Sequence, residues 1–301
     1  EGQTDVFVMQ DHGPVYVQER HGERRHGTMQ DVINFYKLGQ TSRVNAIVGQ
    51  CTVDPHEVDG PNKHLLVTHQ LLRHTDKPIM SWPVATNEKV FKMIEMVMGE
   101  GYLASHYFVT ASVCALSPLQ YAQESADTII AYARANQPVT VLTAPMTGVS
   151  TPISDIGALV AQNAELLAGI VLAQLVQPGV PVIYGTATYA ADMRSGAFIT
   201  GSPLSNLIDR AALQLAQSLY HVPTRTLAGN TDAKVPDIQA GYETMQNYIQ
   251  LLMGGTHMIN ECLGILDGMM TVSYEKYIID EEMLRRVGCM MRGLDTSEAS
   301  F

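Results

Sequence analysis

The sequence predicts a single barrel of the α/β class, a TIM (β/α)8-type fold covering residues 1–301, with an N-terminal β-hairpin at residues 5–20. The chain has 301 residues and 46% apolar residues, which is enough for one large core. Seven short apolar runs are each followed by a helix-length segment, and the runs begin roughly 30 to 40 residues apart, as in parallel strands joined by returning helices. The runs are Ala46–Val48, Pro78–Met80, Tyr107–Thr110, Val139–Leu142, Val182–Tyr184, Thr224–Leu227 and His257–Ile259.

The start of the chain has a different pattern. Val6–Val8 and Val15–Val17 alternate apolar residues around Gly13-Pro14, whose backbone preferences favour a chain reversal, so they predict the hairpin. This leaves the eighth barrel strand unassigned. We expect it either at Met270–Tyr274 or beyond Phe301, in which case the barrel would be incomplete at the chain end.

Three Ser/Thr-Pro pairs predict helix starts. In Ser117-Pro118, Thr151-Pro152 and Ser202-Pro203 a side-chain acceptor precedes a proline suited to the first helical turn. In a parallel barrel such helix ends face the mouth at the C-terminal ends of the strands and favour an anion there. The helix predicted at residues 152–176 is apolar almost all round, so we expect it to lie between layers or subunits of a homo-oligomer.

Charge and composition exclude several classes of protein. The net charge of −11 has the wrong sign for binding nucleic acid. No uninterrupted apolar run reaches about 18 residues, and the first residues do not resemble a leader peptide, so we expect no membrane association. Cys51, Cys114, Cys262 and Cys289 show no paired spacing, which favours a cytoplasmic protein with free thiols.

Common catalytic motifs are missing from the sequence. It contains no phosphate-binding loop, dinucleotide fingerprint, serine-hydrolase elbow or HExxH zinc motif. His64, His69 and His74 are spaced by five, which turns each by about 140° from the last on a helix. We therefore expect no bound metal.

The candidate site residues lie in the predicted strands or directly after them. They are Trp82, Tyr107, Tyr184, Asn230, Asp232, Lys234 and Glu261. Aromatic faces and carboxylates together attract a desolvated cation such as a quaternary ammonium. The tyrosines could equally fill barrel layers, and Asp232 could pair with Lys234. Glu261 is the most informative of them, because a carboxylate in an apolar segment is costly to bury unless it is paired or functional.

A long ordered set of motifs resembles the trimethylamine methyltransferase family. The motifs are Ala144-Pro145-Met146-Thr147-Gly148, Gln162-Asn163-Ala164-Glu165, Leu175 to Gly185, Asp192-Met193-Arg194-Ser195-Gly196-Ala197-Phe198, Gly201-Ser202-Pro203, Thr231 to Glu243 and Ser273-Tyr274-Glu275-Lys276. The resemblance implies a TIM-barrel enzyme that moves a methyl group from a methylated amine to the cobalt of a corrinoid (cobalamin) carried by a separate protein. The trimethylamine enzymes of the family contain pyrrolysine, whereas every position of this sequence is a standard residue. In this respect the sequence resembles the family members that act on quaternary amines such as glycine betaine, proline betaine or carnitine.

The resemblance also suggests roles for the candidate residues. Trp82, Tyr107 and Tyr184 would form walls around the ammonium, and Glu261 and Asp232, the predicted catalytic residues, would supply negative potential. The rest of the substrate would be bound by Arg194, Ser202 and Asn230. The Arg194 guanidinium would bind a carboxylate through two hydrogen bonds. Arg194 could instead pair with Asp192. A quaternary amine leaves as a neutral tertiary amine, so no general acid is required.

Two other functions fit the same residues. A barrel that binds the amine and docks a corrinoid protein without transferring methyl groups would need the same pocket. An unrelated lyase or aldolase would need a Schiff-base lysine, for which Lys234 is the candidate.

Overall fold

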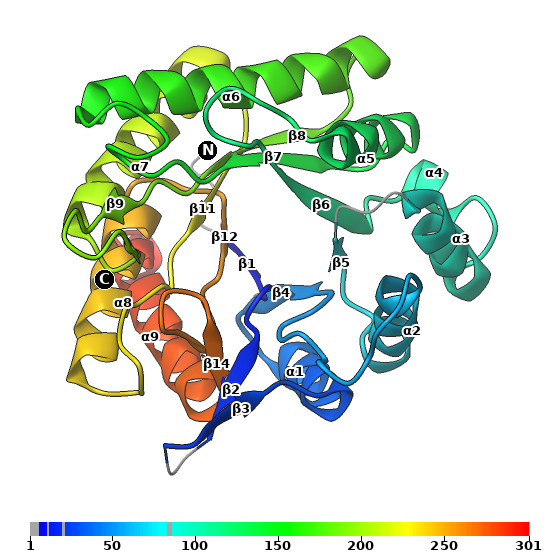
Figure 1. Cartoon of the computed structure of the whole chain (residues 1–301), viewed down its shortest axis with the longest axis horizontal. Coiled ribbons are helices and arrows are strands. Elements are labelled where there is room, and N and C mark those ends of the chain that lie inside the picture. The colour runs from blue at the N-terminus through cyan, green and yellow to red at the C-terminus, as the bar shows by residue number, and fades with distance from the viewer. Residues whose placement is uncertain (1–5, 11, 20–21, 83–85, 301) are drawn as a thin grey trace.

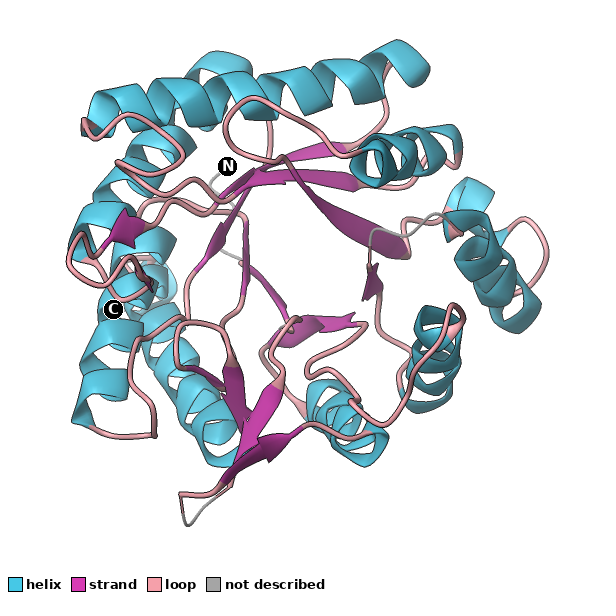
Figure 2. Cartoon of the chain, viewed as in Figure 1, coloured by secondary structure: helices cyan, strands magenta, loops and turns pink. Residues whose placement is uncertain are grey.

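A closed parallel barrel forms the centre of the computed structural model, which describes residues 6–10, 12–19, 22–82 and 86–300. Eight described strands form it, and Figures 1 and 2 show them ringed by helices. In order around the barrel they are β1 (Phe7–Met9), β12 (Met258–Asn260), β11 (Thr224–Leu227), β8 (Val182–Thr186), β7 (Val139–Thr143), β6 (Val109–Cys114), β5 (Ile79–Ser81) and β4 (Asn45–Gly49). All seven apolar runs therefore form barrel strands, as predicted.

The missing eighth strand is β1, so the predicted hairpin is wrong. Val8 pairs in parallel with Ile259 on one side and with Asn45 on the other, which closes the barrel. Residues 15–17 do not return along β1. A short alternating apolar segment has the same local pattern in a hairpin and in a barrel, and only its partners distinguish the two. Residues 5, 11 and 20 of the predicted hairpin lie outside the described residues.

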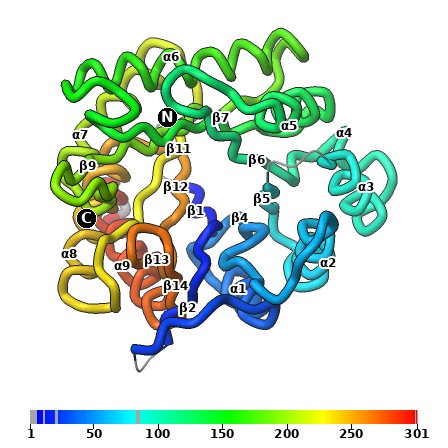
Figure 3. The backbone as a smooth tube through the Cα atoms, in the orientation of Figure 1, coloured from blue at the N-terminus to red at the C-terminus, as the bar shows by residue number. Residues whose placement is uncertain are grey.

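A second sheet flanks the barrel. Its order is β13 (Ile265–Leu266), β14 (Thr271–Ser273), β2 (Tyr16–Gln18) and β3 (Arg24–His26). β14 corresponds to the weak candidate at Met270–Tyr274, so that segment is a strand but not a barrel strand. Figure 3 shows β2, from the N-terminal part of the chain, beside β14, from the C-terminal part. The two strands pair in parallel.

Helices cover the outside of the barrel. They are α1 (Met29–Thr41), α2 (Lys63–His74), α3 (Asn87–Met98), α4 (Tyr102–Ser105), α5 (Gln123–Arg134), α6 (Asp155–Val176), α7 (Pro203–Leu215), α8 (Ile238–Leu252) and α9 (Tyr274–Arg292). A π-helical turn at Ala216–Tyr220 extends α7, a 3-10 turn lies at Glu298–Ser300, and β9 (Ala190–Ala191) and β10 (Phe198–Ile199) form a small antiparallel pair.

One of the three predicted helix starts is confirmed. Ser202 caps α7, with its side chain accepting from Leu204 N, and Pro203 is the first helical residue. Ser117 instead donates to Glu165 Oε2 at 2.7 Å, and α5 begins only at Gln123. The cap of α6 is Ser154 rather than Thr151. A Ser/Thr-Pro pair fits a loop as well as a cap. Ser117 is held by Glu165 on α6, whereas Thr151 Oγ1 donates to Met146 O at 3.3 Å within its own loop.

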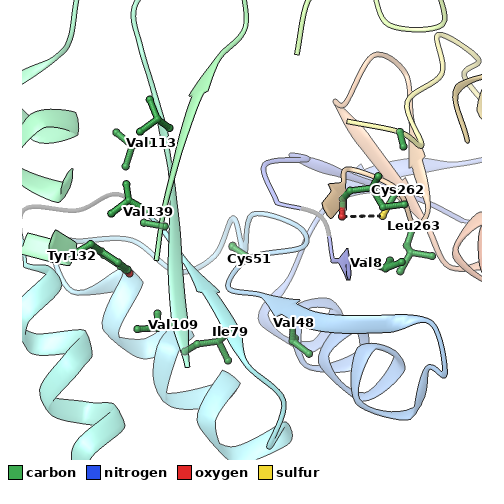
Figure 4. Close-up of a cluster of buried hydrophobic side chains, with 14 of the residues drawn as sticks. Val8, Val48, Cys51, Ile79, Val109, Val113, Tyr132, Val139, Cys262 and Leu263 are labelled. Carbon is green, nitrogen blue, oxygen red and sulfur yellow. Dashed lines mark hydrogen bonds between the residues drawn. The ribbon is translucent and has the colours of Figure 1, made fainter. Parts of the chain in front are cut away.

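Apolar side chains fill two separate layers. Residues such as Val48, Ile79, Val109 and Val139 face outward and pack with the helices in the main core, part of which Figure 4 shows. A second cluster combines Met9, Ile47, Met80 and Met258 from four adjacent strands. Because no helix contributes a buried residue to it, this cluster lies inside the barrel. The interior is therefore packed rather than hollow at this level.

One helix in the described part of the chain, α6, is long and apolar enough to cross a membrane by length and composition. Its inner side packs on the barrel through buried residues that include Gln162 and Glu165. Long apolar core helices in globular proteins meet the same two criteria.

Candidate functional site

Three charged or ionisable side chains meet inside the barrel near its C-terminal mouth. Arg225 comes from β11, Glu261 directly follows β12, and His12 lies in the loop after β1. Parallel strands bring their C-terminal ends to one rim, which is why residues so far apart in sequence meet there. The arrangement places a buried cation close to a buried anion.

Arg225 is fully buried and only partly hydrogen-bonded. Its Nη2 donates to Asn260 Oδ1, while Nε and Nη1 have no hydrogen-bond partner among the described residues. Burial lowers the pKa of Arg225, and the nearby negative charge of Glu261 opposes this effect. The group stays cationic because an arginine pKa starts far above neutrality. Two buried donors are thus available to an anionic ligand.

Glu261 lies beside Arg225 with one oxygen open. Its Oε1 is 2.9 Å from His12 Nδ1, whereas its buried Oε2 has no partner within the described ranges. Asn260 Nδ2 is 3.5 Å from the same Nδ1, so we assign the ring proton to the shorter contact with Glu261. The site therefore holds a carboxylate that can still accept a hydrogen bond or face a cation.

The backbone at Glu261 is unusual. Its φ is +50°, a conformation that few residues other than glycine adopt. Gly229 N donates to Glu261 O at 2.9 Å, and a Cβ on Gly229 would lie 2.3 Å from Cys262 Cα. Only glycine at position 229 allows this close approach. Gly229 therefore holds Glu261 in place.

Aromatic and sulfur-containing side chains cover the polar groups. The rings of Tyr189 and Phe198 lie 5.3 Å apart, and Met269 accepts a weak 3.4 Å contact from the Tyr189 hydroxyl. These side chains form one apolar cluster with Leu142 and Leu227 at the strand ends. Burial raises the pKa of Tyr189, and the Glu261 charge adds to this shift. Tyr189 is therefore a neutral wall of the site.

A buried hydrogen-bond network fixes the segment that carries Tyr189. Gln162 on α6 donates to Thr186 and accepts from Thr188, and Asp209 on α7 accepts from Thr186 Oγ1 and, at 3.0 Å, from Thr188 N. Burial raises the pKa of Asp209 to about 6, although the hydrogen bonds from these threonines oppose the rise. Buried side chains of α6 and α7 thus position the loop after β8.

Asp232 and Ser202 hold backbone in place in this structure. Asp232 Oδ1 accepts from Thr200 N and Thr200 Oγ1, both at 2.9 Å, and its Oδ2 accepts from Gly201 N at 3.1 Å. It does not pair with Lys234, whose ammonium binds Asp267 on the surface. Ser202 caps α7. Both residues fix the loop between β10 and α7 at the rim of the mouth.

Two predicted aromatic walls lie outside the mouth, so their expected places were wrong. Tyr184 is buried between barrel and helices and donates to Asn163 Oδ1 on α6 at 3.0 Å. Because side chains alternate along a strand, its position on β8 points outward. Tyr107 is 61% exposed and precedes β6, which runs on to Cys114. It therefore lies at the opposite, N-terminal end of the barrel.

The other predicted residues lie on the mouth side at different depths. Trp82 directly follows β5, is partly buried and packs against the main core. Asn230 is buried beyond β11, and its Oδ1 has no partner among the described residues. Arg194 is exposed in the turn between β9 and β10, where its backbone N donates to Asp192 Oδ1 at 2.9 Å. Lys234, the Schiff-base candidate, is likewise exposed, with 75% of its side chain accessible.

Sequence reasoning missed His12, Arg225, Tyr189 and Phe198. Arg225 carries the same signal as Glu261, a charge inside an apolar segment, and could have been found in the same way. His12 was hidden by the wrong hairpin. Tyr189 follows β8, and Phe198 lies in a motif already noted, but nothing local shows that their rings meet.

One cavity in the described part of the chain lies away from this site. It has a volume of about 750 Å³ and is lined by residues of β1, β4 and α9, among them Phe7, Val44 and Arg285. These residues lie at the N-terminal ends of the strands, away from Glu261. The described residues contain no group of three or more His, Cys, Asp or Glu side chains that could hold a metal ion.

Solved structures share the fold. The monomethylamine methyltransferase of Methanosarcina barkeri superposes with a TM-score of 0.67 at 8% identity, covering 98% of this chain and 62% of that chain. A dihydropteroate synthase from Coxiella burnetii reaches a TM-score of 0.56 at 10% identity, covering 97% and 95% of the two chains. These similarities confirm the TIM-barrel architecture.

Sequence relatives are more specific. The chain is 34% identical over 301 residues to the glycine betaine methyltransferase of Desulfitobacterium hafniense (strain Y51), which covers 99% of this chain and 62% of the relative. It is 35% identical over 287 residues to the proline betaine:corrinoid methyltransferase of Eubacterium limosum, covering 92% and 59%. The chain thus spans about three-fifths of the length of these relatives. A family model described as "Trimethylamine methyltransferase (MTTB)" matches residues 1–301. The chain therefore belongs to the trimethylamine methyltransferase family.

Proposed function

We propose that this chain binds a quaternary amine carrying a carboxylate and presents one of its methyl groups to a corrinoid protein. The observation that carries the proposal is the pair of open charged groups in the mouth. Among the described residues, Arg225 has two nitrogen donors without a partner and Glu261 has one oxygen without a partner. A betaine is a zwitterion, so it would satisfy both charges at once. The named activities of two relatives, on glycine betaine and on proline betaine, are of this class.

The ammonium end would bind beside Glu261. A quaternary ammonium has no N–H group, so it is recognised by charge and by ring faces rather than by hydrogen bonds. Glu261 supplies the charge, with His12 holding its other oxygen, and Tyr189 and Phe198 supply the rings. Glu261 Oε2 is buried without a hydrogen-bond partner among the described residues, which is costly, and the cation of the ligand would reduce that cost.

The carboxylate end would bind Arg225. The guanidinium presents Nε and Nη1 unpartnered within the described chain, and its Nη2 is already held by Asn260. A carboxylate can accept a charge-assisted hydrogen bond from either of these nitrogens, which would fix the orientation of the ligand as well as its affinity. Asn230, whose buried Oδ1 is also open among the described residues, lies on the same side of the barrel.

Methyl transfer from such a substrate would need positioning rather than proton transfer. The reduced corrinoid of the partner supplies the nucleophile that takes the methyl carbon, and the broken C–N bond leaves its electron pair on the departing tertiary amine. The tasks of this chain are to hold the cation, aim one methyl group outward and exclude water. The corrinoid protein would approach from the mouth, since the C-terminal ends of the strands and the site lie there. We place this reaction in the cytoplasm.

Binding of three matched ligands tests the proposal. Glycine betaine carries both charges, 3,3-dimethylbutanoate replaces its nitrogen by carbon, and tetramethylammonium lacks the carboxylate. We expect calorimetry to show tightest binding for the betaine. Arg225→Met should weaken betaine binding by about 10- to 100-fold, the equivalent of one or two charge-assisted hydrogen bonds, with little effect on tetramethylammonium. Glu261→Gln should weaken both cations and spare 3,3-dimethylbutanoate.

The control is Arg210→Met, the same change at an exposed arginine whose Nη1 donates to Gln250 Oε1 on α8. It should bind all three ligands like the parent chain. Methyl transfer is then followed as methylcobalamin formation after addition of reduced corrinoid. Failure to bind any quaternary amine would contradict the proposal, and binding without methylcobalamin formation would reduce it to an amine-binding module.

A further inference from the structure

Phe198 lies on a short antiparallel ribbon formed by β9 and β10. It pairs with Ala191 across the ribbon, and β9 directly follows Tyr189, so the ribbon joins the two rings of the aromatic wall. Residues 193–197, at the tip of the ribbon, are exposed. An isolated two-stranded ribbon is marginally stable at best in water. The position of the Phe198 ring is therefore set by the contacts at the base of the ribbon.

Two side chains hold the base of the ribbon. On the β9 side, Ala190 N donates to Ser205 Oγ on α7 at 2.9 Å, and Figure 1 shows β9 beside this helix. On the β10 side, Asp232 accepts three hydrogen bonds from Thr200 and Gly201, which directly follow β10. Three hydrogen bonds to two consecutive residues fix both the place and the direction of the strand that carries the ring.

Asp232 is itself held by Glu243, a buried residue of α8. Glu243 Oε2 accepts from Asp232 N at 2.9 Å and from Thr231 Oγ1 at 2.5 Å. A Cβ on Gly201 would clash with the Glu243 side chain, so only glycine lets the base of the ribbon approach this closely. Two carboxylates in series, Glu243 and then Asp232, thus connect α8 to the ribbon.

The ring of Phe198 packs on a third segment, the loop between β13 and β14. A Cβ at Gly268 in this loop would lie 3.6 Å from Phe198 Cε2, an ordinary van der Waals distance. Gly268 N donates to Thr231 O at 3.0 Å, so the loop is bonded to the residue before Asp232. The segment around Asp232 therefore holds both the ribbon that carries the ring and the surface on which the ring lies.

We infer that Asp232 is a positioning residue, which holds the Phe198 ring in the wall of the site. Both oxygens of its carboxylate already accept hydrogen bonds from the base of the ribbon, so Asp232 acts through the backbone of Thr200 and Gly201 instead of attracting the ligand by its charge. The place of the ring follows from these contacts. Its role beside an ammonium group rests on the proposed function, so the two are tested separately.

Tryptophan fluorescence tests the position of the ring without a ligand. Trp82→Phe removes the one tryptophan of the sequence, and Phe198→Trp then places a single indole on the ribbon. Asp232→Ala should shift the indole emission to longer wavelength and increase its quenching by acrylamide, because a ribbon released at its base exposes the ring to water. Asp232→Asn keeps the Oδ1 acceptor for Thr200, so it should retain most of the parent emission.

Asp237→Ala is the matched control for a general loss of stability. Asp237 also accepts a backbone hydrogen bond, from Ala240 N at 3.0 Å, but it caps the start of α8. Its replacement should destabilise the fold through the lost helix cap and leave the indole emission unchanged. Emission and quenching that ignore Asp232→Ala, or that change equally with Asp237→Ala, would overturn the inference.

Calorimetry with glycine betaine tests whether the placed ring matters for binding. Asp232→Ala and Phe198→Ala should each raise the Kd about fivefold, which corresponds to the loss of one ring contact with a cation. The double variant should bind no more weakly than Phe198→Ala alone, because Asp232 acts only through that ring. Additive losses would assign Asp232 another route to the ligand, such as its charge, and would overturn the inference. A parent chain that binds no quaternary amine, with the fluorescence changes still present, would refute the proposed function and support the placement of the ring by Asp232.

Discussion

His12 Nδ1 lies 2.9 Å from Glu261 Oε1, which joins the loop after the first barrel strand to the residue after the last. The two strands, β1 and β12, are themselves paired in parallel. The contact therefore forms at the seam where the barrel closes. It orients a carboxylate whose second oxygen is left for a ligand.

Removal of the His12 ring should weaken binding at the ammonium end. His12→Ala leaves Glu261 Oε1 without its ring donor, so the carboxylate loses its fixed orientation, and we expect the Kd for glycine betaine to rise about tenfold, or roughly 1.4 kcal/mol. Calorimetric titration measures the change. His106→Ala, at an exposed histidine beside Tyr102, should have no effect. Equal losses for the betaine and for 3,3-dimethylbutanoate would mean that His12 acts on the fold instead of on the cation.

Addition of one methyl group at position 229 should destabilise the site and the fold. In Gly229→Ala the new Cβ would lie 2.3 Å from Cys262 Cα, a backbone atom that cannot move aside cheaply. We expect the free energy of unfolding to fall by about 2 kcal/mol or more, by analogy with other overpacked positions. Gly241→Ala on α8 is the control, since no atom of the described residues lies within 4 Å of its Cβ position. There the helix should gain about 0.5–1 kcal/mol. Urea unfolding distinguishes the two, and equal stabilities would contradict the packing argument.

The pH dependence of stability should change when Asp209 is replaced. Burial raises the pKa of Asp209 to about 6, above its ordinary value of 3.8. Between these values the folded state holds more protons than the unfolded state, so the contribution of Asp209 to stability is full below about pH 4 and is lost as the pH rises through 6. Asp209→Asn removes this titration. Its stability relative to the parent chain should improve by about 2 kcal/mol from pH 4 to pH 7.

Unfolding curves at several pH values test this prediction. Asp280, whose pKa burial also raises to about 6, keeps its own titration in the Asp209→Asn chain, so part of the pH dependence should persist. A stability difference between the two chains that does not vary with pH would show that Asp209 has an ordinary pKa in the folded protein.

Breaking the buried ion pair of α9 should be costly. Lys276 Nζ lies 2.7 Å from Asp280 Oδ2, both residues are buried, and Asp280 also accepts from Gly264 N at 2.7 Å. Lys276→Met leaves a buried carboxylate without its cation, and we expect a loss of about 3–5 kcal/mol. Lys276→Met combined with Asp280→Leu should recover part of the lost stability. Thermal unfolding of the three chains gives the comparison, and a double variant no more stable than the single one would refute the charge argument.

The sequence pattern was sufficient for the strands and for one key residue. Runs such as 139–142 and 224–227 contain β-branched residues and are followed by helix-length segments, and these local features predicted barrel strands correctly. Glu261 was singled out because a carboxylate in an apolar segment needs a reason to be there. The structure places it, buried, beside Arg225 and His12.

The failures have a common physical cause. Ile183 and Tyr184 are neighbours on β8, yet Ile183 packs against the interior cluster and Tyr184 points to the helices, since consecutive side chains alternate between the two faces. A shift of one residue would reverse this assignment, and nothing within the strand sets it. Residues 6–8 were assigned to a hairpin for a similar reason, because their pairing partners, β4 and β12, lie far along the chain.

By itself, the amino-acid sequence determined the repeating order of strands and helices, the family motifs and the presence of a costly buried carboxylate. Those features depend on local periodicity and on the desolvation cost of a charge, which are properties of short segments. Only the tertiary structure decided which side chains share the mouth, bringing His12, Tyr189 and Arg225 to Glu261 and taking Tyr107 and Tyr184 away. Barrel closure sets strand register and facing through contacts between distant segments, so those neighbours become defined only when the whole ring has formed.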